Sequence, residues 1–166
     1  LLAEASYYVG IYYNLTNNYD LTISYLAQTI KLKEQFKTTD TIYFKALYNL
    51  GGTYSGLGNF EAHKNLTIKA IESGIEIYGP DSPELILPYA SLITAYIELR
   101  NYSQALELTD IVYRIADLNE ENSDPGEIAF LYGNLGVLYN SKGDYSRSRV
   151  FLEKAEFFYN KAGFYY

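Results

Sequence analysis

The feature of this sequence that most constrains its fold is a pattern that recurs four times at a nearly constant spacing. Each copy has a pair of small or apolar residues, a tyrosine three positions later and an aromatic residue six further on. The shared tyrosines are Tyr13, Tyr54, Tyr96 and Tyr139. The later aromatic residues, 41, 42 and 43 residues apart, are Tyr19, Phe60, Tyr102 and Tyr145. Such a period indicates stacked structural repeats, whose function belongs to a surface and not to a single active site.

Each copy has the sequence signature of a helix, a tight turn and a second helix. Leu135 and Tyr139 are four residues apart and share one helix face, and Gly136 between them allows a partner helix to approach closely. The four turns end in Asn or Asp directly before the aromatic residue, which suits an N-cap. Gly58 and Gly143 suit a left-handed helix end. We expect helices near 2–17, 19–37, 41–57, 60–78, 83–100, 102–119, 125–142 and 145–162.

The segments between copies also carry helix-start signals. "DPGE" at 124–127 places Asp as N-cap, Pro first in the helix and Glu third, and "DSPE" at 81–84 repeats the spacing from Asp81 to Glu84. Pro88 leaves two alternatives open. Either it lies inside a helix that begins near Ser82 and kinks it, or the regular helix begins just before Pro88 after an irregular lead-in.

The repeated motif resembles the tetratricopeptide repeat. The fourth copy matches the family pattern at Tyr132, Leu135, Gly136, Tyr139, Gly143, Tyr145, Ser148 and Ala155. The other copies depart from it: Ile93 replaces the motif glycine in the third, His63 occupies a small-residue position in the second, and the first is the weakest match. The period exceeds the usual length of about 34 residues by roughly two helical turns. This long form is similar to that of kinesin light chains and bacterial repeat arrays.

The resemblance implies an all-α, right-handed superhelical solenoid of four antiparallel helical hairpins. The four repeats would cover residues 1–38, 39–80, 81–122 and 123–166 of a single domain, 1–166. The chain begins without methionine and ends in an aromatic-rich stretch that includes Phe164, Tyr165 and Tyr166. These ends predict that the repeats are a fragment of a longer chain, with a further helix or domain after the C-terminus.

Composition and residue chemistry argue against catalysis. The net charge of −7 and the lack of a basic cluster argue against nucleic-acid binding. Without cysteine there is no thiolate site, and no apolar run is long enough for a membrane span. The sole histidine, His63, is interpreted as a packing substitution, and the acidic loop "NEEN" at 119–122 as a solvated connection. We therefore predict a protein that is not an enzyme and uses no cofactor or metal.

The resemblance places binding on the concave surface, which the first helix of each hairpin lines in this family. The corresponding positions here are Tyr7, Ile11, Asn14, Lys45, Tyr48, Asn49, Gly52, Leu87, Ala90, Thr94, Ile97, Phe130, Asn134 and Val137. Asn49 and Asn134 precede the motif leucine, where long-repeat relatives use asparagine to bond the main chain of a peptide. Two roles remain open for these amides: contact with a bound peptide, or a bridge between adjacent hairpins.

The leading functional hypothesis is a protein–protein interaction scaffold that binds a peptide or partner segment in this groove. The basic residues with which some family members hold a C-terminal carboxylate are missing, because Tyr, Gly, Ala and Thr occupy their positions. The predicted groove is aromatic, rich in amides and weakly charged. The alternative hypothesis is a sensory or regulatory module of a larger signalling protein, such as a kinase, a caspase-like peptidase or a peptide-responsive regulator.

Overall fold

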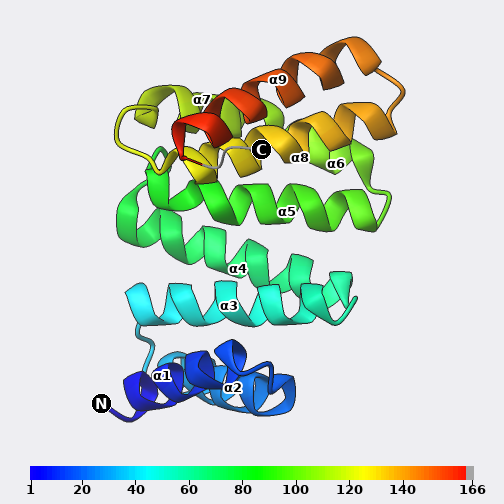
Figure 1. Cartoon of the computed structure of the whole chain (residues 1–166). Coiled ribbons are helices and arrows are strands. Elements are labelled where there is room, and N and C mark those ends of the chain that lie inside the picture. The colour runs from blue at the N-terminus through cyan, green and yellow to red at the C-terminus, as the bar shows by residue number, and fades with distance from the viewer. Residues whose placement is uncertain (164–166) are drawn as a thin grey trace. The chain divides into compact units, whose positions relative to one another are not determined.

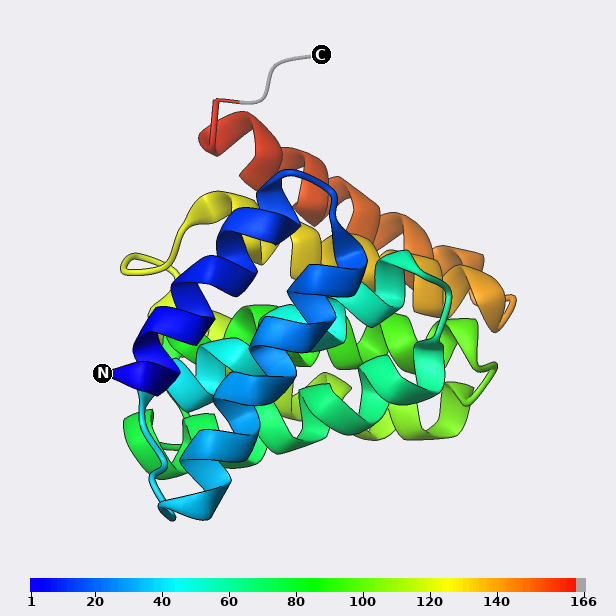
Figure 2. The same cartoon turned by 90° about the horizontal axis from the view of Figure 1, so that it is seen from below.

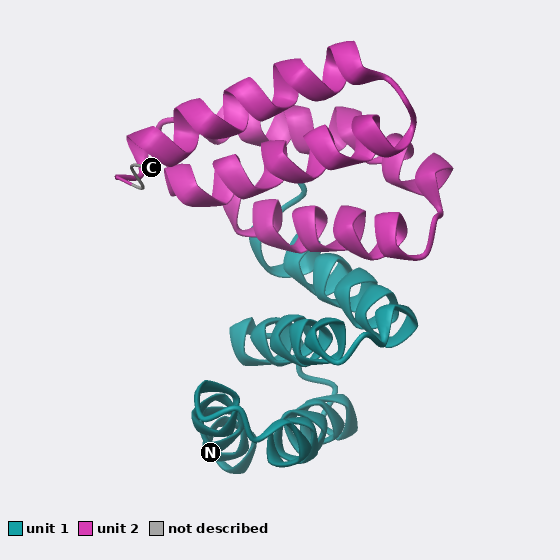
Figure 3. Cartoon of the chain, turned by 45° about the vertical axis from the view of Figure 1, so that its right-hand side comes forward, with its two compact units in different colours: residues 1–80 teal, residues 81–166 magenta. Residues whose placement is uncertain are grey.

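The computed structural model describes residues 1–163, and this part of the chain consists of helices and the turns between them (Figure 1). Residues 1–80 and 81–166 form two compact units, coloured separately in Figure 3. Unit 1 contains α1 (Leu2–Leu15), α2 (Tyr19–Gln35), α3 (Thr41–Gly56) and α4 (Phe60–Tyr78). Unit 2 contains the short 3₁₀ helix η1 (Pro83–Leu85), α5 (Ile86–Glu98), α6 (Tyr102–Glu107), α7 (Thr109–Asn119), α8 (Pro125–Ser141) and α9 (Tyr145–Lys161).

The expected all-α fold of antiparallel hairpins is confirmed. In unit 1, α1 pairs with α2 and α3 with α4, and α3 packs on α2. Figure 2 shows α1 and α2 side by side, joined by a short turn. In unit 2, α8 pairs with α9 and also packs on α5. Phe164, Tyr165 and Tyr166 lie outside the described residues.

The turns inside the hairpins close as the sequence predicts. Asn18, Asn59 and Asp144 each accept a hydrogen bond from the backbone N–H three residues later. Asn101 holds the equivalent position before α6, but its side chain makes no capping bond. Gly58 and Gly143 adopt φ of +74° and +77°, the left-handed conformation expected at a helix end.

The two helix starts between repeats differ from each other. Asp124 is the N-cap of α8, followed by Pro125, and its Oδ1 accepts from the Gly126 N–H at 2.7 Å. The same role is wrong for Asp81, because Ser82 precedes η1 and Asp81 pairs instead with Arg114 of α7, Nε to Oδ1, at 2.8 Å. The two motifs have equal spacing, but an arginine from another helix binds the carboxylate of Asp81, and the spacing gives no sign of this contact.

The structure decides between the two alternatives for Pro88. The 3₁₀ helix η1 covers Pro83–Leu85, the α-helix begins at Ile86, and Pro88 is its third residue. The first four N–H groups of an α-helix have no intrahelical acceptor, so a proline there removes no hydrogen bond. The irregular lead-in is correct, and the regular helix begins just before Pro88.

The single helix expected over residues 102–119 is wrong, because α6 and α7 are separated at Leu108. The Thr109 hydroxyl donates to the carbonyl of Leu106 at 2.8 Å, and the Leu108 N–H bonds the carbonyl of Ala105, only three residues back. A side-chain donor that takes a backbone acceptor competes with the regular helical ladder. The second hairpin arm of the third repeat therefore consists of two helical segments.

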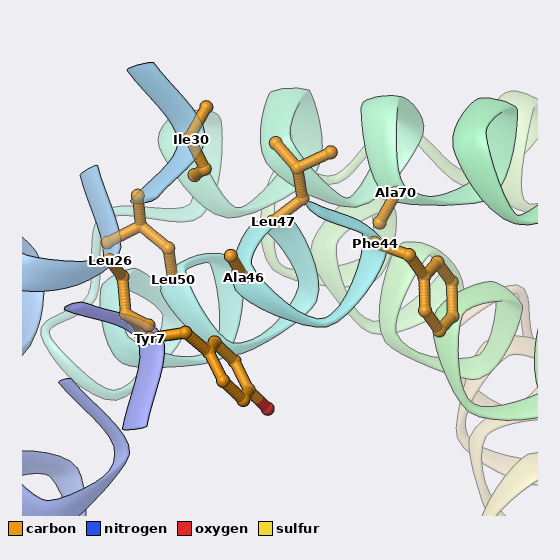
Figure 4. Close-up of a cluster of buried hydrophobic side chains, with 8 residues drawn as sticks. All are labelled: Tyr7, Leu26, Ile30, Phe44, Ala46, Leu47, Leu50 and Ala70. Carbon is orange, nitrogen blue, oxygen red and sulfur yellow. The ribbon is translucent and has the colours of Figure 1, made fainter. Parts of the chain in front are cut away.

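The core of unit 1 is continuous across both of its hairpins. Figure 4 shows one buried cluster that draws side chains from all four helices, namely Tyr7, Leu26, Ile30, Phe44, Ala46, Leu47, Leu50 and Ala70. Gly10 of α1 lies so close to Leu26 of α2 that a Cβ there would stand 2.9 Å from Leu26 Cδ2. The motif glycine therefore sets the distance between the paired helices.

The core of unit 2 combines buried Leu, Ile and Ala side chains with a cluster of aromatic rings. The ring of Tyr132 stacks on Phe151 and Phe158 of α9 with centroids 6.2 and 5.7 Å apart. The ammonium of Lys154 lies 5.0 Å from the ring centroids of both Tyr132 and Tyr113. Burial raises the pKa of Tyr132 to about 12, so its hydroxyl is neutral. These tyrosines fill packing seams.

Candidate functional site

Four of the predicted concave-face residues of unit 1 line one shallow depression, which we call the α3 groove. It measures about 260 Å³ and is lined by Asn14, Tyr19, Tyr48, Asn49, Gly52, Thr53 and Gly56. Asn14 comes from α1, Tyr19 from the first turn of α2, and the remaining residues from α3. The groove therefore joins the two hairpins of unit 1, and its lining carries no ionised side chain at neutral pH.

Asn49 performs the bridging role that the sequence left open. Its Nδ2 donates to the Lys45 carbonyl at 2.8 Å and to the Tyr7 hydroxyl of α1 at 3.3 Å. Burial, followed by the nearby Tyr8, raises the pKa of Tyr7, which keeps that hydroxyl protonated. Both amide hydrogens of Asn49 are thus engaged, and its Oδ1 is the atom left to accept a hydrogen bond from a bound molecule.

The other predicted residues of unit 1 differ in accessibility. Asn14 is half-buried, and its side-chain amide has no hydrogen-bond partner within residues 1–163. Lys45 is exposed, whereas Ile11 packs against the core and Tyr7 is buried. Asn14 therefore offers a donor and an acceptor, while Tyr7 acts through Asn49.

In unit 2 the predicted residues lie on α5 and α8. Asn134 Nδ2 donates to the Ala90 carbonyl of α5 at 3.2 Å, the same bridge between adjacent hairpins that Asn49 makes in unit 1. Ala90 itself is fully buried, so its side chain is not available to a partner. Thr94 bonds the same carbonyl at 3.1 Å, whereas Phe130 and Val137 are exposed. The remaining predicted positions of this unit, Leu87 and Ile97, are half-buried.

The groove also contains residues that the motif-based prediction missed, Tyr19, Thr53 and Gly56. Tyr19 is more than one-third exposed, and its hydroxyl donates to Asn17 Oδ1 at 3.2 Å. The available signal was the helical spacing of Asn49, Gly52, Thr53 and Gly56, which places them along one side of α3.

His63 is a buried packing residue, as the sequence suggests, but its polar atoms are poorly satisfied. The side chain is only 3% exposed, and neither His63 Nδ1 nor the hydroxyl of Thr67, one turn later, has a hydrogen-bond partner within residues 1–163. Both face Gly51 of α3, where a Cβ would stand 3.2 Å from Thr67 Oγ1. Burial lowers the pKa of His63, because the charged imidazolium loses its hydration.

We predict that His63 makes the protein less stable on mild acidification. Its folded-state pKa lies below the ordinary value of 6.5, so the unfolded chain binds the proton first. The stability that the neutral ring contributes is present above that value and is lost as pH falls through the folded pKa. Urea unfolding at several pH values between 7.5 and 5 measures how steeply the free energy of unfolding changes with pH. His63→Ala removes the only histidine and should flatten this slope. An unchanged slope would contradict the prediction. Burial raises the pKa of Glu127, which changes the stability with pH in the opposite direction. This contribution is the same in the wild-type protein and in His63→Ala.

Other polar clusters of the described chain offer little chemistry. Asp117, Glu120, Glu121 and Asn122 surround an open hollow of about 330 Å³ at the end of α7. Among residues 1–163, no three His, Asp or Glu side chains converge as metal ligands. None of the helices in this part of the chain has the length and apolar character that a membrane span requires.

Comparison with known families identifies two segments of this chain. Residues 45–84 and 131–156 match family profiles described as tetratricopeptide repeat. The first covers most of α3 and α4 and the second lies in the α8–α9 hairpin. None of the curated proteins matches the chain by sequence.

Solved structures share the fold. The crystal structure of BtubC (BKLC) from P. vanneervenii is similar with a TM-score of 0.87 and 18% identity, covering 99% of this chain and 66% of BtubC. TPR-like repeats of a kinesin light chain candidate from Podosopora anserina give a TM-score of 0.73 at 12% identity, over 96% of this chain and 75% of theirs. A variant of the same repeats gives 0.76 at 12% identity, over 97% and 76%. This chain therefore spans less than two-thirds of BtubC.

Proposed function

This chain is a tetratricopeptide repeat protein, a class of protein–protein interaction scaffold, and we propose that it binds an extended peptide or partner segment in the α3 groove of unit 1. Partner binding of this kind needs a surface that offers hydrogen bonds to a main chain together with aromatic contact area. The α3 groove supplies both, from amides and tyrosines on two adjacent hairpins.

The observation that carries this proposal is the convergence of Asn14, Tyr48 and Asn49 on one depression. Asn14 of α1 lies more than thirty residues before Tyr48 and Asn49 of α3 in sequence, yet all three line the same groove. Asn14 has a free amide and Asn49 a free Oδ1, so together they match the alternating donors and acceptors of a peptide backbone. A partner segment that pairs with them would also cover the tyrosine rings.

The proposed activity is binding without catalysis. The lining of the α3 groove consists of amides, hydroxyls and glycines, and it includes no carboxylate, imidazole or amine to act as a general acid or base. The acidic balance of the chain, 20 Asp and Glu against 13 Lys and Arg, favours a protein partner over a nucleic acid.

We expect the double substitution Asn14→Ala with Asn49→Ala to weaken peptide binding about tenfold or more, because each lost hydrogen bond contributes about 1 kcal/mol. A random-sequence peptide array identifies binding peptides for the whole chain, and fluorescence anisotropy then measures their affinities for both proteins. Thermal unfolding reports whether losing the Asn49 bridge to Tyr7 also lowers stability.

The matched control is Asn65→Ala, which removes an exposed amide of α4 outside the groove. It should leave binding unchanged. If no peptide of the array binds the protein, the proposed function is wrong. If peptides bind equally well to the double variant, the groove assignment is wrong.

A further inference from the structure

Two depressions of unit 1 meet at one side chain. Beside the α3 groove lies a second hollow of about 420 Å³, which we call the turn pocket, lined by Thr16, Asn17, Asn18, Tyr19, Asp20 and Leu57. Tyr19 lines both depressions. The α3 groove extends along α3 to Gly56, and the turn pocket begins at the next residue, Leu57. The two depressions therefore form one continuous path, which runs along α3, passes Tyr19 and ends at the α1–α2 turn.

The floor of this path is bare helix backbone. Gly52 and Gly56 lie one turn apart on α3 and are both exposed, and a Cβ added at either would meet no atom within 4 Å. Neither glycine has positive φ, so the backbone conformation does not require it. A glycine inside a helix destabilises it relative to alanine. Neither packing nor conformation explains these two residues, whereas close approach of another chain does.

The open floor is particular to the second repeat. The position of Gly52, two residues after the motif leucine or valine, is occupied by Ile11, Thr94 and Val137 in the other repeats. Val137 is exposed on α8, so a valine is compatible with this position of the fold. The space above Gly52 therefore results from the residue itself, because the other three repeats carry a branched side chain at this position.

The charges at the two ends of the path have opposite signs. Lys45 is exposed one turn before Asn49, and Asp20 lines the turn pocket at the other end. Within residues 1–163, neither side chain has an ion-pair partner. Lys45 and Gly56 are about 16 Å apart along the helix, the length of about five extended residues.

We propose that the partner segment is an extended peptide that lies along α3, with small residues over Gly52 and Gly56 and a basic side chain that reaches Asp20. This inference rests on the proposed function and specifies its ligand. The main chain of the peptide can approach α3 closely only if the peptide's own side chains over Gly52 and Gly56 are small. We therefore expect glycine, alanine or serine at these peptide positions. One of the peptide's N–H groups donates to Asn49 Oδ1. Its basic residue then enters the turn pocket, where Asp20 carries the only charge.

The test compares variants of the whole chain on peptides selected from a random-sequence array. The selected peptides should contain small residues followed by Lys or Arg. Gly52→Val should weaken their binding about tenfold, because the added side chain fills the path. Its unfolding temperature should not fall, since the space is open in the free protein. Gly52→Ala serves as a second variant with a smaller side chain and a weaker effect in the same direction.

The matched control is Gly133→Val, which adds the same side chain to α8 at a helical glycine whose Cβ also meets nothing within 4 Å. It should leave binding unchanged. Asp20→Asn should reduce binding about threefold for peptides with the basic residue and have no effect on peptides in which glutamine replaces it.

The outcomes separate this inference from the proposed function. A complete lack of peptide binding overturns the proposed function. Binding that tolerates Gly52→Val, or that falls equally in Gly133→Val, overturns the path along α3 and leaves the scaffold function in place. Selected peptides with bulky or acidic residues throughout would also overturn the ligand class.

Discussion

Gly136→Val is expected to lower the free energy of unfolding by about 3 kcal/mol, because it inserts a branched side chain where α8 and α9 touch. A Cβ at Gly136 would stand 2.6 Å from Leu152 Cδ2 and 2.7 Å from its Cγ. The carbonyl of Gly136 also accepts the buried Ser148 hydroxyl at 2.8 Å. A valine at this position must first displace the Leu152 side chain, which is 47% exposed, before its methyl groups approach α9. Urea unfolding followed by circular dichroism measures the change.

A matched control and a rescue sharpen this prediction. Gly133→Val places the same side chain on the same helix, three residues earlier and in open space, and should change stability by less than about 1 kcal/mol. Leu152→Ala removes the atoms that Gly136→Val would meet, so the double variant should recover part of the loss. Equal destabilisation by the two valines would show that helix propensity, and not the contact with α9, governs Gly136.

Leu26→Ala is expected to lower the free energy of unfolding by about 3 kcal/mol, because it leaves a cavity beneath the closest approach of α1 to α2. Leu26 is fully buried in the cluster that unites the two hairpins of unit 1 (Figure 4). Its Cδ2 is the atom that a Cβ at Gly10 would meet at 2.9 Å. Surrounding residues from α1, α2 and α3 cannot collapse into the space without moving a helix.

Leu21→Ala is the matched control, since Leu21 lies on the same helix and is 36% exposed. The substitution removes the same atoms, but fewer of them are buried. It should therefore lower the free energy of unfolding by about 1 kcal/mol or less. Comparable losses at the two positions would contradict the assignment of Leu26 to the core. Urea unfolding of the three proteins under identical conditions provides the comparison.

Much of the fold could be predicted because the relevant interactions are local. The N-caps at Asn18, Asn59 and Asp144 act within three residues, and the left-handed glycines Gly58 and Gly143 act within one turn. The period of the aromatic residues then extends this local pattern along the chain. Seven of the eight expected helices begin and end within a few residues of their predicted limits.

The errors arose where residues distant in sequence, or a side chain competing for the backbone, decided the outcome. The predicted N-cap role of Asp81 was wrong, and its carboxylate forms an ion pair with Arg114 of another helix. The expected sixth helix was interrupted because the Thr109 hydroxyl bonds the Leu106 carbonyl. Other threonine hydroxyls, such as that of Thr53, also bond backbone carbonyls inside unbroken helices, so the residue type alone does not predict the interruption.

The candidate site was partly visible in the sequence. Motif positions placed Asn14, Tyr48, Asn49 and Gly52 on the concave face, and these four line the α3 groove. The same reasoning included Ala90, whose side chain is fully buried, and missed Tyr19, which connects the groove to the turn pocket. A motif assigns a face of a helix, but neighbouring helices determine how much of that face remains accessible.

Periodic apolar residues and local caps specify a helical hairpin without reference to the rest of the chain, so the repeat and its helices could be predicted from the sequence. The roles of individual polar groups depend instead on tertiary contacts. Asn49 and Asn134 could equally have been contacts or bridges, and their Nδ2 atoms prove to bond Tyr7 and Ala90. Gly52 and Gly51 are adjacent in sequence, yet a Cβ at Gly51 would press on Thr67 while one at Gly52 would enter open space. Whether a side chain packs or stays accessible depends on which atoms of other helices lie next to it. Those atoms come close only when the hairpins have stacked.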